Sequence, residues 1–382
     1  AFSYVDGLTN INFPKSLKEI GSYAFYGCKS LKDITLNDGL NNIDYDAFEG
    51  IKLKKLHLPA SLQTISLNGI ELDEIDVDKE NKAFITNGDN ILLGSDYEIL
   101  WTGKNATLPK QYTVIYEGCF DGQKFEKVII NEPCVSVSGF SNCGTIEEFH
   151  LPKSVKRISD FAFNTHIKKI FVDKDNLWFA TNDEHTKLFD ITKTILYYSA
   201  DGDIPEGVKV VKWSNIRHKG IDKLYIPSTL CSLTTPREHI DIEHVKSVNV
   251  SADNPYYEGY KNTIIRKNDG ALVFIPNNSD IPDGIRKIAC EAFSGGSLIS
   301  AIHIPASVKY IEKHTFDACD AIESIVVDKD NPIFESRGNC LIVKKSGVAI
   351  AKAKDAQLPE GVVLSGCRDI SLKINDEYHD CI

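Results

Sequence analysis

The chain has 382 residues, of which 42% are hydrophobic and 25% are charged, and this is the composition of a folded globular protein rather than a disordered or collagen-like one. The formal net charge is −11 at pH 7 and no cluster of Lys and Arg stands out, so we expect no nucleic-acid partner. No apolar stretch approaches the roughly 18 residues that a membrane-spanning helix needs, so we expect no transmembrane segment.

A short apolar pattern recurs from the first residues onward. Between Leu17 and Leu36 it reads LxxI, then Ala-Phe, then LxxIxL. The next two copies open at Leu40 and Leu62, 23 and 22 residues further on. Later copies, some of them weaker, open at Tyr112, Val135, Val155, Val208, Leu230, Ile285 and Val308. Repeats of about 20–29 residues are typical of leucine-rich repeat proteins, whose coils bury their apolar faces only by stacking.

The end of each copy predicts a β-strand. In LxxIxL the last two apolar residues alternate with one other residue, so they point inward while the residue between them faces outward. Proline then ends the strand in several copies, at Pro59, Pro152, Pro227 and Pro305. The Ala-Phe pair is expected on the opposite wall of the coil, in a short helical or turn segment.

Three of the ten cysteines follow the Phe of the repeat by three residues, at Cys28, Cys143 and Cys319. A position that recurs inside stacked coils is better filled by a buried thiol than by a reactive one. No CxxC pair occurs, so no zinc site of that type is expected. We expect these three cysteines to lie in the core, while a disulfide set among the others stays open.

The segment from Ile20 to Cys28, IGSYAFYGC, and its continuation to Leu36 resemble the unit IGxxAFxGCxxLxxIxLPxSV of BspA-like leucine-rich repeats nearly letter for letter. The resemblance extends over almost the entire chain. It implies one leucine-rich-repeat solenoid over residues 1–382, a β-rich α/β fold with short helical or 3-10 turns. Members of this family look like bacterial surface adhesins and binding scaffolds, so the resemblance also implies a binding role at a cell surface.

A longer unit is superimposed on the short one. The pentapeptide VDKDN occurs at Val172–Asn176 and again at Val327–Asn331, and related stretches begin at Val77 and Val250. Each Asn precedes an aromatic residue by three positions and a proline by 28 or 29. Between them lie two short apolar pieces, which a turn sequence such as Lys267–Gly270 separates. We therefore expect four β-hairpin inserts in the solenoid, at about residues 78–109, 173–205, 251–282 and 328–359.

The pentapeptide itself has two interpretations. Asp and Asn bond their own backbone in turns, so VDKDN is expected to leave a repeat strand and enter the hairpin. A calcium-binding loop would need the pattern D-x-[DN]-x-[DN]-G. The loop that starts at Asp173 has Leu177 and Trp178 where that pattern needs Asp or Asn and then Gly, so we favour the turn.

The ends of the chain carry parts of the repeat. Ala1-Phe2 matches the Ala-Phe pair, so the chain is expected to begin within a coil, with any N-terminal targeting region outside it. At the other end a last copy starts at Leu358 and decays into polar residues. Residues 360–382 are therefore expected to form a C-terminal partial repeat or a cap.

Catalytic and metal chemistry find little support in the sequence. His57, His150 and His303 occupy the same repeat position, but they lie several coils apart. Neighbouring strands are spaced by about 4.8 Å, so these imidazoles are not expected on one metal ion. No GxSxG, HExxH, P-loop or GxGxxG motif occurs. An accidental Cys–His nucleophile stays open, but we expect no catalytic residue, cofactor or metal, and hence no enzyme.

What remains is the outward face of the repeat strands. Apolar and aromatic residues stand at several positions there where polar residues are expected, and exposed aromatic residues carry binding energy at interfaces. The candidate ligand-binding face consists of Ile129, His150, Phe171, Tyr225, His303 and Val326. The alternative is that a hairpin insert or a neighbouring coil covers these side chains.

The sequence therefore favours a non-catalytic scaffold or adhesin at a bacterial cell surface, extracellular or surface-bound, with a host or extracellular-matrix protein as its ligand. A large preformed face would bind through several coils at once with little ordering cost. Carbohydrate binding is the alternative, and it predicts aromatic side chains grouped in one groove. An enzyme would instead have a deep pocket with converging titratable groups.

Overall fold

The computed structural model describes residues 2–86, 90–103, 108–120, 122–160, 162–213, 221–233, 245–276, 279–290, 292–293, 299–316, 319 and 321–364. These residues form two compact units, unit 1 with the described residues up to 200 and unit 2 with those from 201 on. Most of residues 360–382, the predicted partial repeat or cap, lies outside the described residues. A single solenoid over residues 1–382 stays a prediction.

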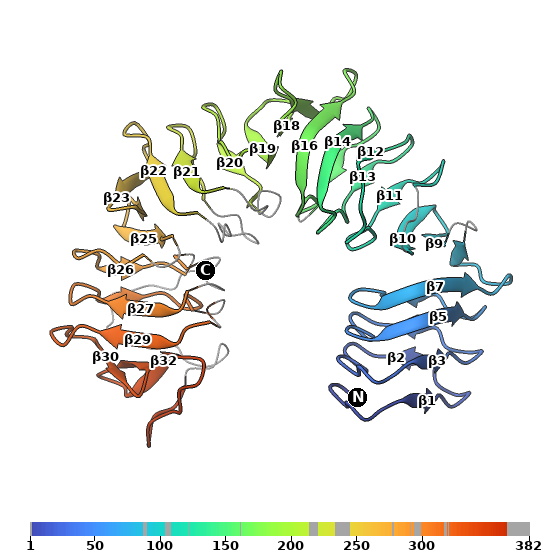
Figure 1. Ribbon diagram of the computed structural model, residues 1–382, viewed down its shortest axis with the longest axis horizontal. Helices are drawn as coiled ribbons and strands as arrows, with labels where there is room; N and C mark the ends of the chain where they lie inside the picture. Colours follow the sequence, from blue (N-terminus) through green and yellow to red (C-terminus); the bar gives the residue numbers. More distant parts are fainter. Residues whose placement is uncertain are drawn as a thin grey trace. The chain divides into compact units, whose positions relative to one another are not determined.

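Unit 1 is a stack of coils, most of which contribute one strand to each of two walls (Figure 1). The first wall holds the longer strands, and its pairs are parallel. Its strands are β1 (Asn10–Asn12), β3 (Asp33–Thr35), β5 (Lys52–Leu58), β7 (Glu71–Val77), β12 (Lys127–Ile129), β14 (Thr145–Leu151) and β16 (His166–Val172). The apolar residues of LxxIxL form these strands: Leu53, Leu56 and Leu58 of β5 are buried, and the residues between them are exposed.

The second wall of unit 1 holds shorter strands. They are β2 (Glu19–Ile20), β4 (Asn42–Ile43), β6 (Thr64–Ile65), β11 (Val114–Ile115), β13 (Ser136–Val137) and β15 (Arg157–Ile158). Their pairs are parallel as well. The second residue of nearly every one of these strands is buried, so the two walls enclose a common core.

Three antiparallel strands follow β7, and another three follow β16. The first group is β8 (Phe84–Thr86), β9 (Ile91–Gly94) and β10 (Glu98–Thr102), and the second is β17 (Phe179–Thr181), β18 (Lys187–Asp190) and β19 (Ile195–Ser199). Both groups lie within ranges where the sequence predicts an insert. The last strand of the first group, β10, pairs in parallel with β11 and so rejoins the second wall.

Unit 2 has the same kinds of element. Its strands are β20 (Val210–Val211), β21 (Lys223–Ile226), β22 (Ser247–Val250), β23 (Tyr257–Tyr260), β24 (Thr263–Arg266), β25 (Ala271–Phe274), β26 (Lys287–Ile288), β27 (Ala301–Ile304), β28 (Tyr310–Ile311), β29 (Ser324–Val327), β30 (Phe334–Arg337), β31 (Cys340–Val343) and β32 (Val348–Lys352). The pairs β21–β22, β25–β26, β26–β28 and β27–β29 are parallel. Strands β23 to β25 and β30 to β32 form antiparallel ladders.

The predicted solenoid of stacked coils is present, but apart from the single 3-10 residue Trp213 the described residues form only strands, turns and loops, so the predicted α/β class with helical turns is not supported. The Ala-Phe segments are turns in which only some N–H groups donate within the segment, as Ala24 N does to Gly21 O at 3.1 Å, while the groups between them donate to the next coil. Phe25 N donates to Ala47 O at 2.9 Å, and Gly27 N donates to Glu49 O at 2.8 Å. A helix would need these donors within its own turn. Tyr23 also has a φ of 58°, a left-handed conformation outside the helical range.

The aromatic residues of the repeat hold neighbouring coils of unit 1 together. Phe140 stacks on Phe120 with ring centroids 5.1 Å apart, and it meets Phe149 edge-on at 5.1 Å. Phe149 in turn meets Phe163 at 5.2 Å. All four rings are fully buried. The contacts from Phe140 to Phe120 and from Phe149 to Phe163 join neighbouring coils, while the contact between Phe140 and Phe149 joins two sides of one coil.

The cysteines of the repeat are part of this core, as predicted. Cys28, Cys143 and Cys319 are 0%, 1% and 6% exposed. The Cys28 thiol donates to Phe2 O at 2.8 Å, and the Cys143 thiol donates to Phe120 O at 3.2 Å, in both cases in the preceding coil. None of the eight cysteines that the structure describes is in a disulfide.

The VDKDN stretches are turns, as predicted. Asp173 Oδ1 accepts a hydrogen bond from Asp175 N at 2.8 Å, and Asn176 N donates to Asp173 O at 2.9 Å. The Asn176 side chain does more than close its own turn: its Nδ2 donates to Pro152 O at 2.9 Å and to Val155 O at 3.0 Å in the preceding coil. Equivalent bonds are made by Asn81, Asn254 and Asn331. A buried amide thus ties each antiparallel group to the coil before it.

Candidate binding site

Three of the six candidate residues form a row across neighbouring strands, which we call the strand row. Ile129 of β12, His150 of β14 and Phe171 of β16 are direct partners in the parallel register of these strands. The residue before each of them is buried in the core of unit 1. Because successive side chains of a strand alternate between its faces, the strand row points outward.

The strand row has an aromatic surface. The rings of His150 and Phe171 stack with centroids 4.7 Å apart and planes 16° apart. Ile129 is 52% exposed. Phe171 is partly buried, because the ring of His185, from the turn between β17 and β18, lies 4.5 Å from it. The alternative that an insert covers the face therefore applies in part to Phe171 and not to Ile129.

His185 was not predicted as a neighbour of this face. It lies inside the predicted insert at about residues 173–205, and a polar turn of an insert is expected to point into solvent. Instead Ile170 N donates to His185 O at 2.7 Å, which holds the turn against β16. His185 has a φ of 59°, and no sequence pattern signals a left-handed histidine.

Charged side chains run beside the strand row. Lys127, Glu148 and Lys169 are partners in the same register, and Lys127 Nζ lies 2.6 Å from a carboxylate oxygen of Glu148. His150 Nε2 lies 3.0 Å from the same carboxylate. The hydrogen bond from Lys127, and then the one from His150, lower the pKa of Glu148 to about 2. The apolar row therefore borders on a carboxylate that stays ionised at physiological pH.

The other three candidates lie in unit 2, in two separate sheets. Tyr225 of β21 is 39% exposed and is the register partner of Asn249 on β22. His303 of β27 is the register partner of Val326 on β29, which is 50% exposed. All three face outward. His303 and Val326 are therefore neighbours on paired strands, whereas Tyr225 lies on a different sheet.

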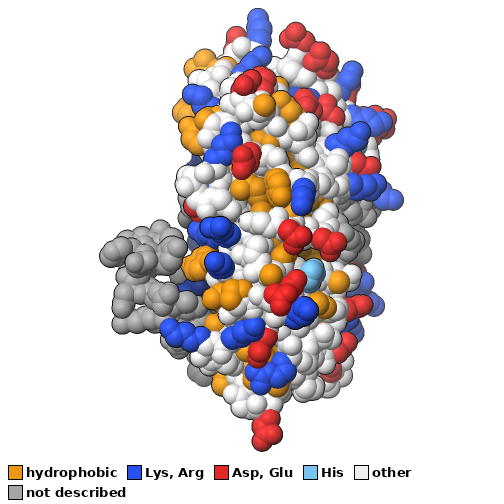
Figure 2. Space-filling model, turned by 90° about the vertical axis from the view of Figure 1, so that its left-hand side faces the viewer, with side chains coloured by type: hydrophobic (Ala, Val, Ile, Leu, Met, Phe, Trp, Pro, Cys, Tyr) orange, Lys and Arg blue, Asp and Glu red, His pale blue; other side chains and the backbone are white. Residues whose placement is uncertain are grey.

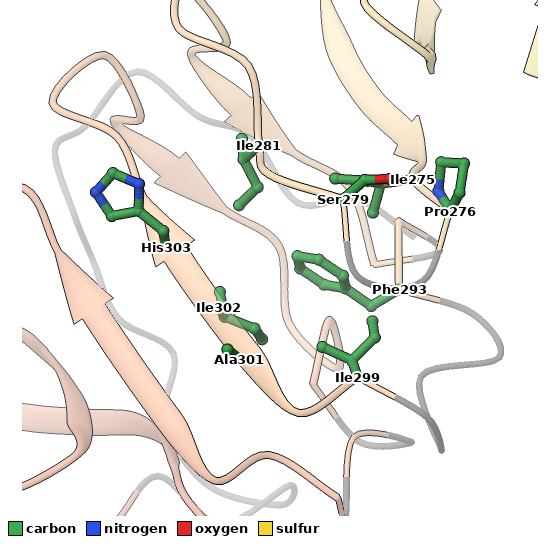
Figure 3. Close-up of a pocket in the computed structure, with 9 residues that line it drawn as sticks. All are labelled: Ile275, Pro276, Ser279, Ile281, Phe293, Ile299, Ala301, Ile302 and His303. Carbon is green, nitrogen blue, oxygen red and sulfur yellow. The ribbon is translucent and has the colours of Figure 1, made fainter. Parts of the chain in front are cut away.

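The hollow that the described residues form beside His303 is small. Figure 3 shows His303 at the margin of a hollow that also involves the buried side chains of Phe293 and Ile302. The hollow measures about 10 Å³, which is room for about one water molecule. His303 is thus an exposed strand residue and not the wall of a ligand cavity.

The three equivalent histidines do not converge. His57 Nδ1 lies 2.8 Å from a carboxylate oxygen of Asp76, while His150 and His303 lie in other sheets. In the part of the chain that the structure describes, no group of three or more His, Cys, Asp and Glu side chains is placed to hold a metal ion. On the face drawn in Figure 2, acidic and basic side chains lie interspersed among hydrophobic ones. No helix within the described ranges is long and apolar enough to cross a membrane.

The different burial of Cys134 and Cys231 predicts that their thiols react at different rates. Burial raises the pKa of Cys134 to about 12, so almost none of its nucleophilic thiolate is present at pH 8. Cys231 is only partly buried. We expect iodoacetamide at pH 8 to modify Cys231 in the native protein and to modify Cys134 only after unfolding, as measured by peptide mass spectrometry. Equal modification of both cysteines in the native protein would contradict this expectation.

Comparison with family models identifies the repeat. The model of the BspA type leucine rich repeat region matches in six copies, at residues 1–81, 102–181 and 276–338, which is more than half of the chain. No curated protein matches the chain significantly.

Several solved structures resemble this one. They include a leucine rich cell surface protein from Faecalibacterium prausnitzii, with 18% sequence identity over 86% of this chain and 62% of that chain and a TM-score of 0.30. The pneumococcal vaccine antigen PcpA is 20% identical over 84% of this chain and 62% of its own, with a TM-score of 0.26. A leucine-rich repeat protein from Bacteroides ovatus is 16% identical over 86% of this chain and 75% of its own, with a TM-score of 0.33. The chain thus spans less than two thirds of the length of the first two.

Proposed function

The chain belongs to the family of BspA-type leucine-rich repeat proteins, and on that premise we propose that it is a non-catalytic binding protein of a bacterial cell surface. Its ligand would be a host or extracellular-matrix protein, bound through the outward face of the repeat strands. The observation that supports this proposal most is the strand row of Ile129, His150 and Phe171, three neighbouring residues of a parallel sheet.

The strand row combines apolar exposure with a rigid base. Ile129 is 52% exposed, and the stacked rings of His150 and Phe171 continue its surface. Aromatic side chains at the centre of a contact carry much of the binding energy between proteins. The hydrogen bonds of the parallel ladder hold β12, β14 and β16 before any ligand arrives, so binding would order little backbone.

The charged side chains beside the row would form the rim of such an interface. Lys127 and Glu148 pair across two strands, and Lys168 Nζ lies 2.8 Å from Glu147 across the next. Charges at the rim of an interface act mainly on association rate and specificity, while the apolar centre sets the dissociation rate. The proposed site thus has the usual order of an apolar centre and a polar border.

We expect Phe171→Ala to raise the dissociation constant for a protein ligand roughly 30-fold, the effect of losing a hot-spot contact of about 2 kcal/mol. Ile129→Arg should weaken binding at least as much, since it places a charge in the apolar centre at a position that is 52% exposed. The measurement is surface plasmon resonance of the chain against a panel of immobilised host serum and extracellular-matrix proteins, with thermal unfolding of each variant alongside.

The matched control is Tyr45→Ala, which removes a tyrosine that is 56% exposed in unit 1 but lies in the turn after β4, outside the strand row. Its binding should equal that of the parent protein. A ligand whose affinity is unaffected by both Phe171→Ala and Ile129→Arg would place binding elsewhere. A panel without any ligand would argue against recognition of host proteins.

A further inference from the structure

A second surface of unit 1 lies on the outer side of its short-stranded wall. Ile115 of β11, Val137 of β13 and Ile158 of β15 are buried, with exposures of 1%, 0% and 8%. The residues on either side of them therefore face outward. In the row before them, Val114, Ser136 and Arg157 are register partners. The row after them consists of Tyr116, Ser138 and Ser159.

These two rows line a groove of about 440 Å³, within the range of about 300–1,000 Å³ that small-molecule sites occupy. Two features of the fold open it. Strand β15 is the last strand of its sheet, and Tyr197, which lines the groove as well, comes from β19 in another sheet. The side chains of Ser136 on β13 and of Ser138 directly after it are small and leave the space between these boundaries unfilled.

Equivalent positions elsewhere in the chain are filled by the protein's own side chains. On the sheet of β2, β4 and β6, the Asn42 side chain bonds to those of Asp44 and Thr64. On the sheet of β26 and β28, Lys287 Nζ lies 2.8 Å from a carboxylate oxygen of Glu312. In the groove, Ser136 and Ser138 stand where the other sheets have such hydrogen-bonded or ion-paired polar side chains. The opening is therefore a local property of this part of the repeat and not a general consequence of stacking coils.

The groove offers hydrogen-bonding groups that the protein does not use itself. Ser138 is 3% exposed, and its Oγ is a buried atom without a hydrogen-bond partner. Buried polar atoms are almost always bonded, so an unpaired one at the edge of a groove points to a ligand or a water. Within the described residues, neither Lys156 nor Arg157, both exposed and both lining the groove, has an ion pair.

The aromatic and charged residues that line the groove indicate which chemical class of ligand it could bind. Tyr116, 49% exposed, and Tyr197 bring two aromatic rings with polar tips to the groove, as the alternative of carbohydrate binding requires. Lys156 and Arg157 each carry one positive charge and Glu117 carries one negative charge, so the net charge of the lining is +1. A ligand that fits these groups has several hydroxyls, an apolar ring face and one negative charge.

We propose that this groove binds a saccharide that carries one carboxylate, such as a sialic acid or uronic acid unit. Arg157 binds the carboxylate in the forked geometry that guanidinium groups favour. Ser136 and Ser138 bond to sugar hydroxyls, and the ring of Tyr116 packs on the apolar face of the sugar. This site is separate from the strand row and does not depend on protein binding there.

The test is isothermal titration calorimetry of the whole chain with three probes: 3′-sialyllactose, a glucuronate-containing disaccharide, and lactose as the neutral analogue. Saturable binding of an acidic probe, at least tenfold tighter than that of lactose, is expected. The sialylated probe represents a host glycan and the glucuronate a polysaccharide source, so the preferred probe identifies the source. No binding of either acidic probe, or equal binding of lactose, would overturn the proposal.

Point variants locate the site. We expect Arg157→Ala and Tyr116→Ala each to raise the dissociation constant of the acidic probe about tenfold or more, because a charge-assisted bond or a ring contact is lost. The controls Arg286→Ala and Tyr256→Ala remove an exposed arginine and an exposed tyrosine that do not line the groove and should change nothing. Phe171→Ala should leave saccharide binding intact. Binding that survives Arg157→Ala, or that only Phe171→Ala abolishes, would overturn the proposal.

Discussion

Replacing Asn176 by alanine is expected to destabilise unit 1 by about 3 kcal/mol, because buried and partly buried backbone groups of two turns lose their hydrogen bonds to this side chain. The side chain is 3% exposed and makes four hydrogen bonds. Its Nδ2 donates to Pro152 O and Val155 O at 2.9 and 3.0 Å, and its Oδ1 accepts from Trp178 N and Phe179 N at 2.8 and 2.9 Å. The amide thus bonds to two turns of successive coils at once.

The measurement is the free energy of unfolding in urea, with Asp175→Ala as the control. Asp175 is exposed in the same turn, and surface substitutions of this kind usually change stability by less than about 0.5 kcal/mol. An Asn176→Ala loss below about 1 kcal/mol would mean that the four bonds contribute little beyond local turn formation.

An Asn176→Asp variant separates the donor from the acceptor role. One carboxylate oxygen would keep the hydrogen bonds from Trp178 N and Phe179 N, which lower the pKa. The other would face the carbonyl oxygens of Pro152 and Val155, and we expect this repulsion together with burial to outweigh those bonds and to raise the pKa in the folded state above the unfolded value of about 3.9. The folded state then binds more protons than the unfolded one between these two pKa values. The variant should therefore be least stable at neutral pH and should recover stability as the pH falls through the folded-state pKa.

Phe140→Ala is expected to have the larger effect on stability, about 3–5 kcal/mol, the usual cost of removing a buried phenylalanine ring. Phe140 is fully buried and its ring meets those of Phe120, Phe125 and Phe149 at 5.1, 5.9 and 5.1 Å. Phe120 and Phe125 belong to the preceding coil, and Phe149 lies on β14 in the same coil as Phe140. In an array in which each coil contacts only its neighbours, the resulting cavity weakens the junction between two coils and cannot be compensated from further away.

Hydrogen exchange of the backbone amides, followed by mass spectrometry, would report this loss. We expect faster exchange in β11, β13 and β15, around the cavity, than in β1 and β3. The control is Phe140→Leu, which keeps most of the apolar volume and should cost less than about 1.5 kcal/mol. Similar losses from both substitutions would show that ring contacts between coils are not what stabilises this junction.

The repeat was predictable because it follows from side-chain burial alone. In β5 the residues Leu53, Leu56 and Leu58 recur at the spacing that the pleat of a strand requires, and they are buried as that spacing implies. The same reasoning placed Cys28 and Cys143 in the core. Apolar periodicity reports which side chains avoid water, and that information is contained in the sequence.

The helical turns were predicted wrongly, because burial patterns do not reveal where backbone N–H groups find their acceptors. An Ala-Phe pair is compatible with a helix or a turn. In the structure Phe25 N donates to Ala47 O in the next coil, and this bond excludes the helical one. The VDKDN turns show the same limit: their own-backbone bonds were foreseen at Asp173, but the bonds of the Asn176 side chain to the preceding coil were not.

The sequence by itself determined the period of the repeat, its buried positions, its strands and the turns rich in Asp and Asn, since each of these depends on residues close together in the chain. Only the tertiary structure decided which outward residues meet. Register placed Ile129, His150 and Phe171 side by side but left Tyr225 on another sheet, and the end of a sheet at β15 opened the groove between Arg157 and Tyr197. Both outcomes depend on hydrogen bonds between coils and on where a sheet ends, which residue spacing along one chain does not specify.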